Sequence, residues 1–161
     1  MTLNLQNNNY ISILDAFIHT IKATISKPYC DLDKPLGKDG WSLRQHIYHL
    51  IDTPIGGLHT GLEQVMSIPD FILEIIPDLD NLNEERRVFN HIEILKDLDN
   101  YSYAFHKVLA SYNQSKLDTI IIETSFPKRG FKEDRSARTL LDRLFVRHWS
   151  EHLYDMTNVN N

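Results

Sequence analysis

The sequence predicts an all-α protein built as a four-helix bundle. Four segments place apolar residues at the three- and four-residue spacing of amphipathic helices. Long connections lie on either side of the third segment, as in bundles with crossover connections. A chain of 161 residues has an ordinary length for one compact unit, so we expect residues 1–161 to form a single domain.

The first helix is expected over residues 8–26, where apolar side chains recur at helical spacing and Pro28 follows. Residues 29–40 contain a proline, two glycines and several charged side chains. That composition predicts a loop between the first and second helices.

The second helix has the clearest start signal in the chain. Ser42 and Gln45 match a capping box, in which each side chain bonds the backbone amide of the other residue. The apolar stripe that follows continues as far as Val65, with Pro54 inside it. We therefore expect Pro54 to kink this helix rather than to end it.

The region after the second helix is expected to be irregular. Residues 67–83 contain two prolines and several acidic residues, with room for one short helix near residues 71–76. The third helix follows, because an apolar stripe at helical spacing runs from Val88 to Tyr112.

One short segment in the last third of the chain differs from the rest. β-branched residues are frequent in residues 119–125, so this is where a short extended segment is expected, if the chain has one. Residues 127–135 are polar and contain Gly130, which predicts a loop. Ser136 is placed to cap the final helix.

Composition argues against several classes of protein. The formal net charge of −5 disfavours a nucleic-acid-binding module, which normally carries a basic excess. Cys30 is the single cysteine, so there is no disulfide framework and no all-thiolate metal site, as in a reducing compartment. No stretch has the length of a membrane span, and the N-terminus lacks a basic and apolar leader pattern. We expect a cytoplasmic protein with neither a membrane nor a nucleic-acid partner.

Two histidines in the final helix point to a metal site. His148 and His152 are one helical turn apart and project from the apolar face of this helix or from its edge. A buried polar group needs a hydrogen bond or a ligand, and imidazole is the commonest metal ligand. An inward pair at this spacing favours metal binding, with two hydrogen-bonded core histidines as the alternative.

A catalytic metal usually has three protein ligands, and His49 is the candidate for the third. It lies in the well-capped second helix, close to Pro54. Its helix face also carries Gln45 and Asp52, so this face is either solvated or forms a polar pocket between helices. In the pocket, Asp52 would bond an imidazole nitrogen from outside the metal site, with Gln45 beside it.

The order of these features resembles the DinB-like metalloprotein superfamily, which includes bacillithiol and mycothiol S-transferases. The resemblance rests on Trp-Ser-x-x-Gln at residues 41–45, on the His-Leu-x-Asp run that begins at His49, and on His-x-x-x-His at the end of the chain. It implies a four-helix bundle with a long crossover, usually dimeric, in which His49, His148 and His152 bind a divalent metal such as Zn, Ni, Fe or Mn. His46 does not occupy a ligand position in this pattern.

The second helix and the connection after it depart from the family pattern. The helix-breaking residues from Pro54 to Gly57 and the connection over residues 67–83 look particular to this chain. Because family members differ most around the substrate pocket, these departures leave the substrate open.

Such a site implies two reactions. Three neutral imidazoles leave a divalent ion with its full charge and an open position, where water becomes more acidic and a thiol is deprotonated. The resemblance favours activation of a low-molecular-weight thiol for transfer to an electrophilic small molecule, in detoxification or a stress response. Hydrolysis of an amide or ester by the same site is the alternative. A non-catalytic metal-binding bundle is a third interpretation.

Three charged residues near the histidine pair are candidates for substrate chemistry. Glu151 is a candidate general base, with a solvated helix residue as the alternative. Arg147 and Arg138 are candidates to hold an anionic substrate, with a surface salt bridge and a solvated loop residue as the alternatives.

We also expect a homodimer. Ile94 and Tyr101 add apolar surface beside the main stripe of the third helix, and a two-fold dimer is the commonest closed assembly.

Overall fold

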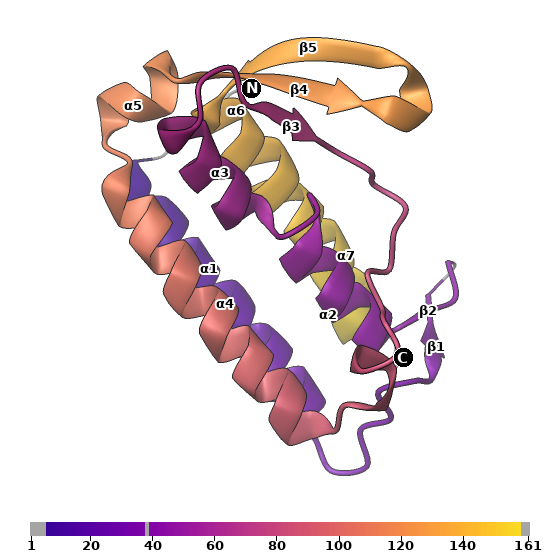
Figure 1. Cartoon of the computed structure of the whole chain (residues 1–161). Coiled ribbons are helices and arrows are strands. Elements are labelled where there is room, and N and C mark those ends of the chain that lie inside the picture. Colours follow the sequence, from indigo (N-terminus) through magenta and orange to yellow (C-terminus); the bar gives the residue numbers. More distant parts are fainter. Residues whose placement is uncertain (1–5, 38, 159–161) are drawn as a thin grey trace.

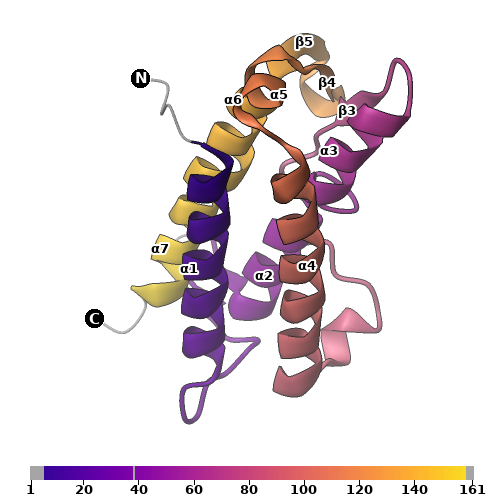
Figure 2. The same cartoon turned by 90° about the vertical axis from the view of Figure 1, so that its left-hand side faces the viewer.

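The structure is a computed structural model of the chain, and it describes residues 6–37 and 39–158. Its body is a four-helix bundle, in which α1 and α4 lie side by side and the last helix packs near α2 (Figures 1 and 2). The helical arms are α1 (Asn7–Ile25), α2 with α3 (Leu43–Asp52 and Leu58–Ser67), α4 (His91–Ser111), and a continuous last helix of α6 (Ala137–Leu140), a π-helical segment (Leu141–Arg147) and α7 (His148–Thr157). The bundle predicted from the sequence is confirmed, and added strands make all-α an approximate description.

The second helical arm is broken rather than kinked, so the expectation for Pro54 was wrong. α2 ends at Asp52, and α3 begins at Leu58. Between them Gly56 and Gly57 have φ values of 84° and 88°, which side chains other than glycine rarely adopt. A helix cannot continue through two such residues, and the apolar stripe resumes in a separate helix.

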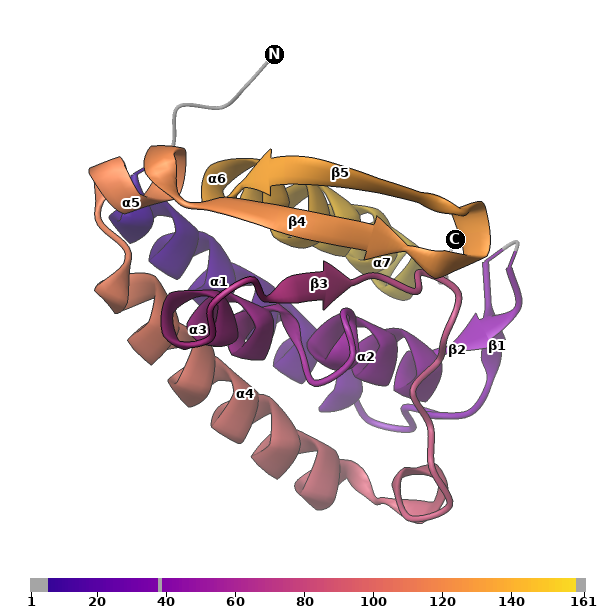
Figure 3. The ribbon, with the colours of Figure 1, turned by 45° about the horizontal axis from the view of Figure 1, so that its top comes forward.

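A three-stranded sheet lies over one end of the bundle (Figure 3). β3 (Ile72–Glu74) forms where a short helix was expected, and β5 (Phe131–Ser136) forms where a polar loop was expected. The predicted extended segment is confirmed as β4 (Ile121–Phe126). β4 is the central strand, parallel to β3 and antiparallel to β5. The sequence of β5 lacks the alternation of apolar and polar residues that predicts a strand. The reason is that β5 is an edge strand whose side chains are at most half-buried.

The interior of the bundle is aromatic. Trp149 of α7 stacks on Tyr101 of α4 and on Phe17 of α1, with ring centroids 5.5 and 6.0 Å apart. Ile94 and Tyr101 are both buried in this core. They therefore add no apolar surface for a partner, and that argument for a dimer was wrong. No helix in the described part of the chain is long and apolar enough to cross a membrane.

The loop before α2 folds into a small hairpin that places Trp41 beside this helix. Pro35–Leu36 (β1) pairs with Trp41–Ser42 (β2), which leads directly into the capped start of α2. The predicted capping box is present, with the Gln45 Oε1 atom accepting from the Ser42 amide at 2.9 Å.

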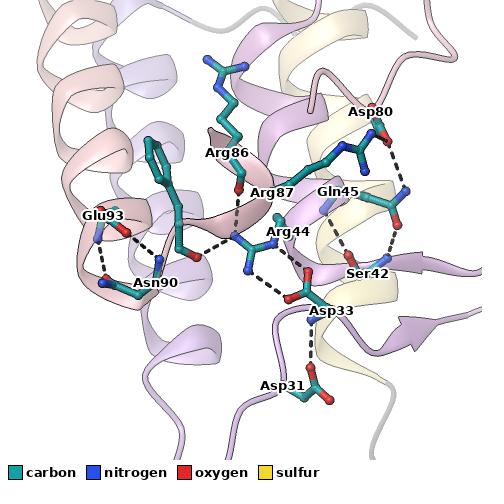
Figure 4. A network of polar contacts seen from close by, with 11 residues as sticks. Asp31, Asp33, Ser42, Arg44, Gln45, Asp80, Arg86, Arg87, Asn90 and Glu93 are labelled. Carbon is teal, nitrogen blue, oxygen red and sulfur yellow. Dashed lines mark hydrogen bonds and ion pairs between the residues drawn. The ribbon is translucent and has the colours of Figure 1, made fainter. Parts of the chain in front are cut away.

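Arg44 anchors two loops to the first turn of α2 (Figure 4). Its guanidinium donates to both carboxylate oxygens of Asp33, at 2.7 and 3.0 Å. It also donates to the carbonyl oxygens of Arg86 and Phe89, at 2.8 and 2.7 Å. A buried side chain thus ties the connection that leads from β3 to α4 onto the helix that carries His49.

Candidate metal centre

The three histidines predicted as ligands lie between α2, which carries His49, and α7, which carries His148 and His152. The Nε2 atom of His148 lies 3.0 Å from Nε2 of His49 and 3.0 Å from Nε2 of His152. One nitrogen from each of the three side chains lies within 4.8 Å of the other two. The structure therefore brings together the two histidines of the last helix and the one chosen from the second.

Each of the three imidazoles also has a hydrogen-bond partner outside the group of three. Nδ1 of His49 lies 2.7 Å from the carbonyl oxygen of Leu79. His148 bonds the backbone of Leu144, one turn earlier in the same helix. Since a carbonyl only accepts, Nδ1 of His49 carries the proton, and the lone pair of its Nε2 atom points to the other histidines.

His152 has a side chain rather than a carbonyl as its outward partner. Its Nδ1 atom lies 2.7 Å from Nδ1 of His46, which belongs to α2 and is 2% exposed. His46 therefore contacts one of the three candidate ligands, His152, on the nitrogen that does not contact His148. His46 was not among the residues predicted for the site, although its position three residues before His49 on the same helix indicates that the two share a side of α2.

Burial keeps these imidazoles neutral. Burial is the largest cause, and together with the neighbouring histidines it lowers the pKa of His148 to about 4 and that of His152 to about 3. Burial also lowers the pKa of His49, against the opposing effect of the Leu79 carbonyl. Neutral imidazole is the form that binds metals, so all three are in the ligating state at neutral pH.

The donor set fits a divalent ion of the zinc type. Two imidazole nitrogens that each lie about 2.0–2.1 Å from one tetrahedral ion are about 3.3 Å apart. The two Nε2–Nε2 separations of 3.0 Å are close to that value. Imidazole ligands suit Zn, Ni, Cu and Fe rather than Mg or Ca.

Trp41 forms one wall of the centre. Its ring stacks on His152 at a centroid distance of 5.9 Å, and it meets His49 edge-on at 4.9 Å. The β1–β2 hairpin thus positions an apolar surface directly against two of the three imidazoles.

Asp52 and Gln45 do not bond the histidines directly, contrary to expectation. The Asp52 carboxylate accepts from Arg86 at 2.5 Å, and the Gln45 amide donates to Asp80 at 3.3 Å. Both side chains instead hold the connection that carries Leu79. The carbonyl oxygen of Leu79, from this connection, takes the position at Nδ1 of His49 instead.

The charged residues expected to hold substrate lie away from the three nitrogens. Arg147 and Glu151 pair with each other at 3.0 Å on the exposed side of the last helix. Arg138 is buried and pairs with Asp118, with Nε–Oδ1 at 2.5 Å, near the start of the last helix. That placement makes Arg138 a structural residue and leaves Glu151 facing solvent.

A separate cavity of about 200 Å³ lies beside the ends of α1, α2 and α7. Its floor includes Leu43 and Met156, one turn from His46 and His152 respectively. Its full lining is Thr24, Lys27, Pro28, Tyr29, Cys30, Asp31, Lys34, Leu36, Leu43 and Met156. The two lysines and one aspartate leave it with a positive balance.

No protein-family model matches the chain, and no curated protein sequence matches it. Among solved structures the chain is similar to YfiT from Bacillus subtilis, described as a probable metal-dependent hydrolase with an unusual four-helix bundle topology. The match has a TM-score of 0.69 and 17% sequence identity, and covers 95% of this chain and 85% of YfiT. The chain therefore has the four-helix-bundle fold of YfiT, as its resemblance to the DinB-like superfamily implied.

Proposed function

We propose that the protein is an enzyme that binds one divalent metal ion through His49, His148 and His152. The observation that carries this proposal is the orientation of the imidazoles. Nε2 of His148 lies 3.0 Å from the Nε2 atoms of both His49 and His152, and each ring has a further hydrogen-bond partner outside the group of three. Converging lone pairs repel one another unless a proton or a cation lies between them, and a cation satisfies all three at once.

A metal held by three neutral ligands keeps its full charge and lowers the pKa of a water or thiol bound to it. The roles of the protein's own groups follow from their positions. The three imidazoles hold the ion, the carbonyl oxygen of Leu79 fixes the ring of His49, and Trp41 shields one side from water.

Thiol transfer to an electrophilic small molecule is the reaction we propose first. Low-molecular-weight thiols commonly carry carboxylates, and the cavity beside the ends of α2 and α7 presents Lys27 and Lys34. Its lining residues Leu43 and Met156 lie one helical turn along the chain from His46 and His152, on the two helices that carry the proposed ligands. Arg138 and Arg147 have no part in this arrangement.

Hydrolysis is the second candidate, because YfiT is described as a probable metal-dependent hydrolase. The same three histidines would serve a water in place of a thiol. The two reactions differ in whether a thiol enters the coordination sphere and is consumed.

Cobalt substitution followed by turnover assays separates these reactions. For thiol transfer, a low-molecular-weight thiol should produce a sulfur-to-metal charge-transfer band. The thiol should also be consumed in step with the electrophile, and both signals should be lost in Lys27→Ala/Lys34→Ala at low thiol concentration. Cleavage of esters or amides without any thiol effect would establish the hydrolase instead. A metallated protein that is inactive in both assays would indicate a non-catalytic metal-binding bundle.

A further inference from the structure

We propose that His46 is a positioning residue that orients His152 for metal binding. This inference rests on the proposed metal site and adds to it a fourth histidine that does not bind the metal. His46 is buried, and its ring meets that of His152 at a centroid distance of 5.0 Å and an interplanar angle of 67°.

The short contact between His46 and His152 requires one shared proton. Their Nδ1 atoms are 2.7 Å apart, so one nitrogen donates and the other accepts. Nε2 of His152 faces the candidate centre at 3.0 Å from His148, and it needs its lone pair to bind a metal. The proton of neutral His152 must therefore lie on Nδ1, and His46 must accept it.

The same logic fixes the tautomer of His46. Because Nδ1 of His46 accepts, its own proton lies on Nε2. His46 also meets His152 at the outward nitrogen, away from the metal-facing Nε2 atom. A metal bound by His49, His148 and His152 therefore lies on the opposite side of the His152 ring from His46.

His46 differs from the other two outward partners in its chemistry. His49 and His148 are held by backbone oxygens, which accept but never donate. An imidazole does either, so the orientation of His152 depends on one side chain that substitution can alter. Outer partners of this kind typically change metal affinity by about 10–100-fold when they are removed.

Two substitutions of His46 separate its role as an acceptor from its role in packing. His46→Asn places an amide oxygen near the position of Nδ1, whereas His46→Leu keeps similar bulk and accepts nothing. Zinc affinity, measured by competition with a chelator, should fall about 10–100-fold in His46→Leu. It should stay within about threefold of wild type in His46→Asn. His106→Leu, which alters a surface histidine paired with Asp15, serves as the control and should bind zinc as wild type does.

Nitrogen-15 NMR of the zinc-loaded wild-type protein tests the same inference without a substitution. We expect the proton on Nδ1 of His152 and on Nε2 of His46. The opposite assignment would overturn the proposal, as would equal zinc affinity in wild type and His46→Leu, or equal weakening in His46→Leu and His46→Asn. A wild-type protein that binds no metal would instead overturn the proposed function and this inference together.

Discussion

Nε2 of His49 lies 3.0 Å from Nε2 of His148, although 99 residues separate the two along the chain. The candidate centre therefore exists only when α2 and α7 are packed together. Its third member, His152, belongs to the same helix as His148 and adds no further long-range constraint. Metal binding at this site should be coupled to folding, because the unfolded chain does not hold the three nitrogens together.

We predict that the metal-free protein loses stability as the pH falls below about 6.5. Burial lowers the pKa of His148 from 6.5 to about 4 and that of His152 to about 3. Between these values and 6.5 the unfolded chain binds protons that the folded chain excludes, so acid favours unfolding. The loss approaches about 1.4 kcal/mol per pH unit for each histidine involved.

Urea unfolding of the chelated protein between pH 7.5 and 4.5 measures this dependence. His148→Asn should show a shallower loss, because an amide does not titrate over this range. A wild-type midpoint that stays constant down to pH 4.5 would contradict the depressed pKa values.

Arg44→Met should destabilise the protein by about 2–4 kcal/mol, because two backbone carbonyls and Asp33 lose a buried donor. The carbonyls of Arg86 and Phe89 accept from this guanidinium at 2.8 and 2.7 Å. Asp33→Asn is the matched control, since Asp33 is largely exposed and its amide oxygen still accepts from Arg44. It should cost about 1 kcal/mol or less. Equal losses in the two variants, measured by chemical denaturation, would contradict the anchoring role of Arg44.

Gly57→Ala should destabilise the protein more than Gly40→Ala does. A Cβ atom at Gly57 would lie 2.6 Å from the Ile51 carbonyl oxygen and from the His59 ring, and φ there is +88°. Gly40 has a similar φ of +68° but no heavy atom within 4 Å of the added Cβ. Gly40→Ala should therefore cost only the backbone penalty of about 1–2 kcal/mol, and Gly57→Ala clearly more. Equal unfolding midpoints would contradict the overlap at Gly57.

The helices were predictable from the sequence because their apolar stripes and caps are local. The capping box of Ser42 and Gln45 and the stripe of the first helix both appear in the structure as expected. The break after Asp52 was missed because the apolar stripe continues in phase through it, so that Pro54 and the paired glycines predicted a kink rather than two helices. β5 was missed because the sequence of this exposed edge strand does not alternate between apolar and polar residues.

The histidine side chains of the candidate site could be predicted from the sequence, but the backbone group that contacts them could not. His148 and His152 are one turn apart, and His49 was chosen for its place in the well-capped second helix and matches the family pattern. Leu79 could not be found in this way, because its contribution is a backbone carbonyl that any residue would supply. Its position depends on Arg44, Asp52 and Arg86, whose contacts join residues 11–45 positions apart.

The homodimer stays a prediction, now carried by the family resemblance and by the frequency of two-fold assemblies. Light scattering should give twice the chain mass of 18.8 kDa at micromolar concentration. The exposed apolar residues Val88, Ile92 and Tyr103 lie on or beside α4 and offer a surface for such an interface. The mass of a single chain across a wide concentration range would contradict this prediction. If a dimer is found, Ile92→Lys tests whether this surface forms the interface.

The metal content of the purified protein and its histidine variants tests the central claim most directly. After reconstitution with zinc and removal of loosely bound ions, we expect close to one ion per chain in the wild type and in His106→Ala. His49→Ala, His148→Ala and His152→Ala should each lose most of it, because two imidazoles alone bind weakly. The account would be contradicted by a wild-type protein that retains no zinc, cobalt, nickel or iron, or by full retention in His49→Ala.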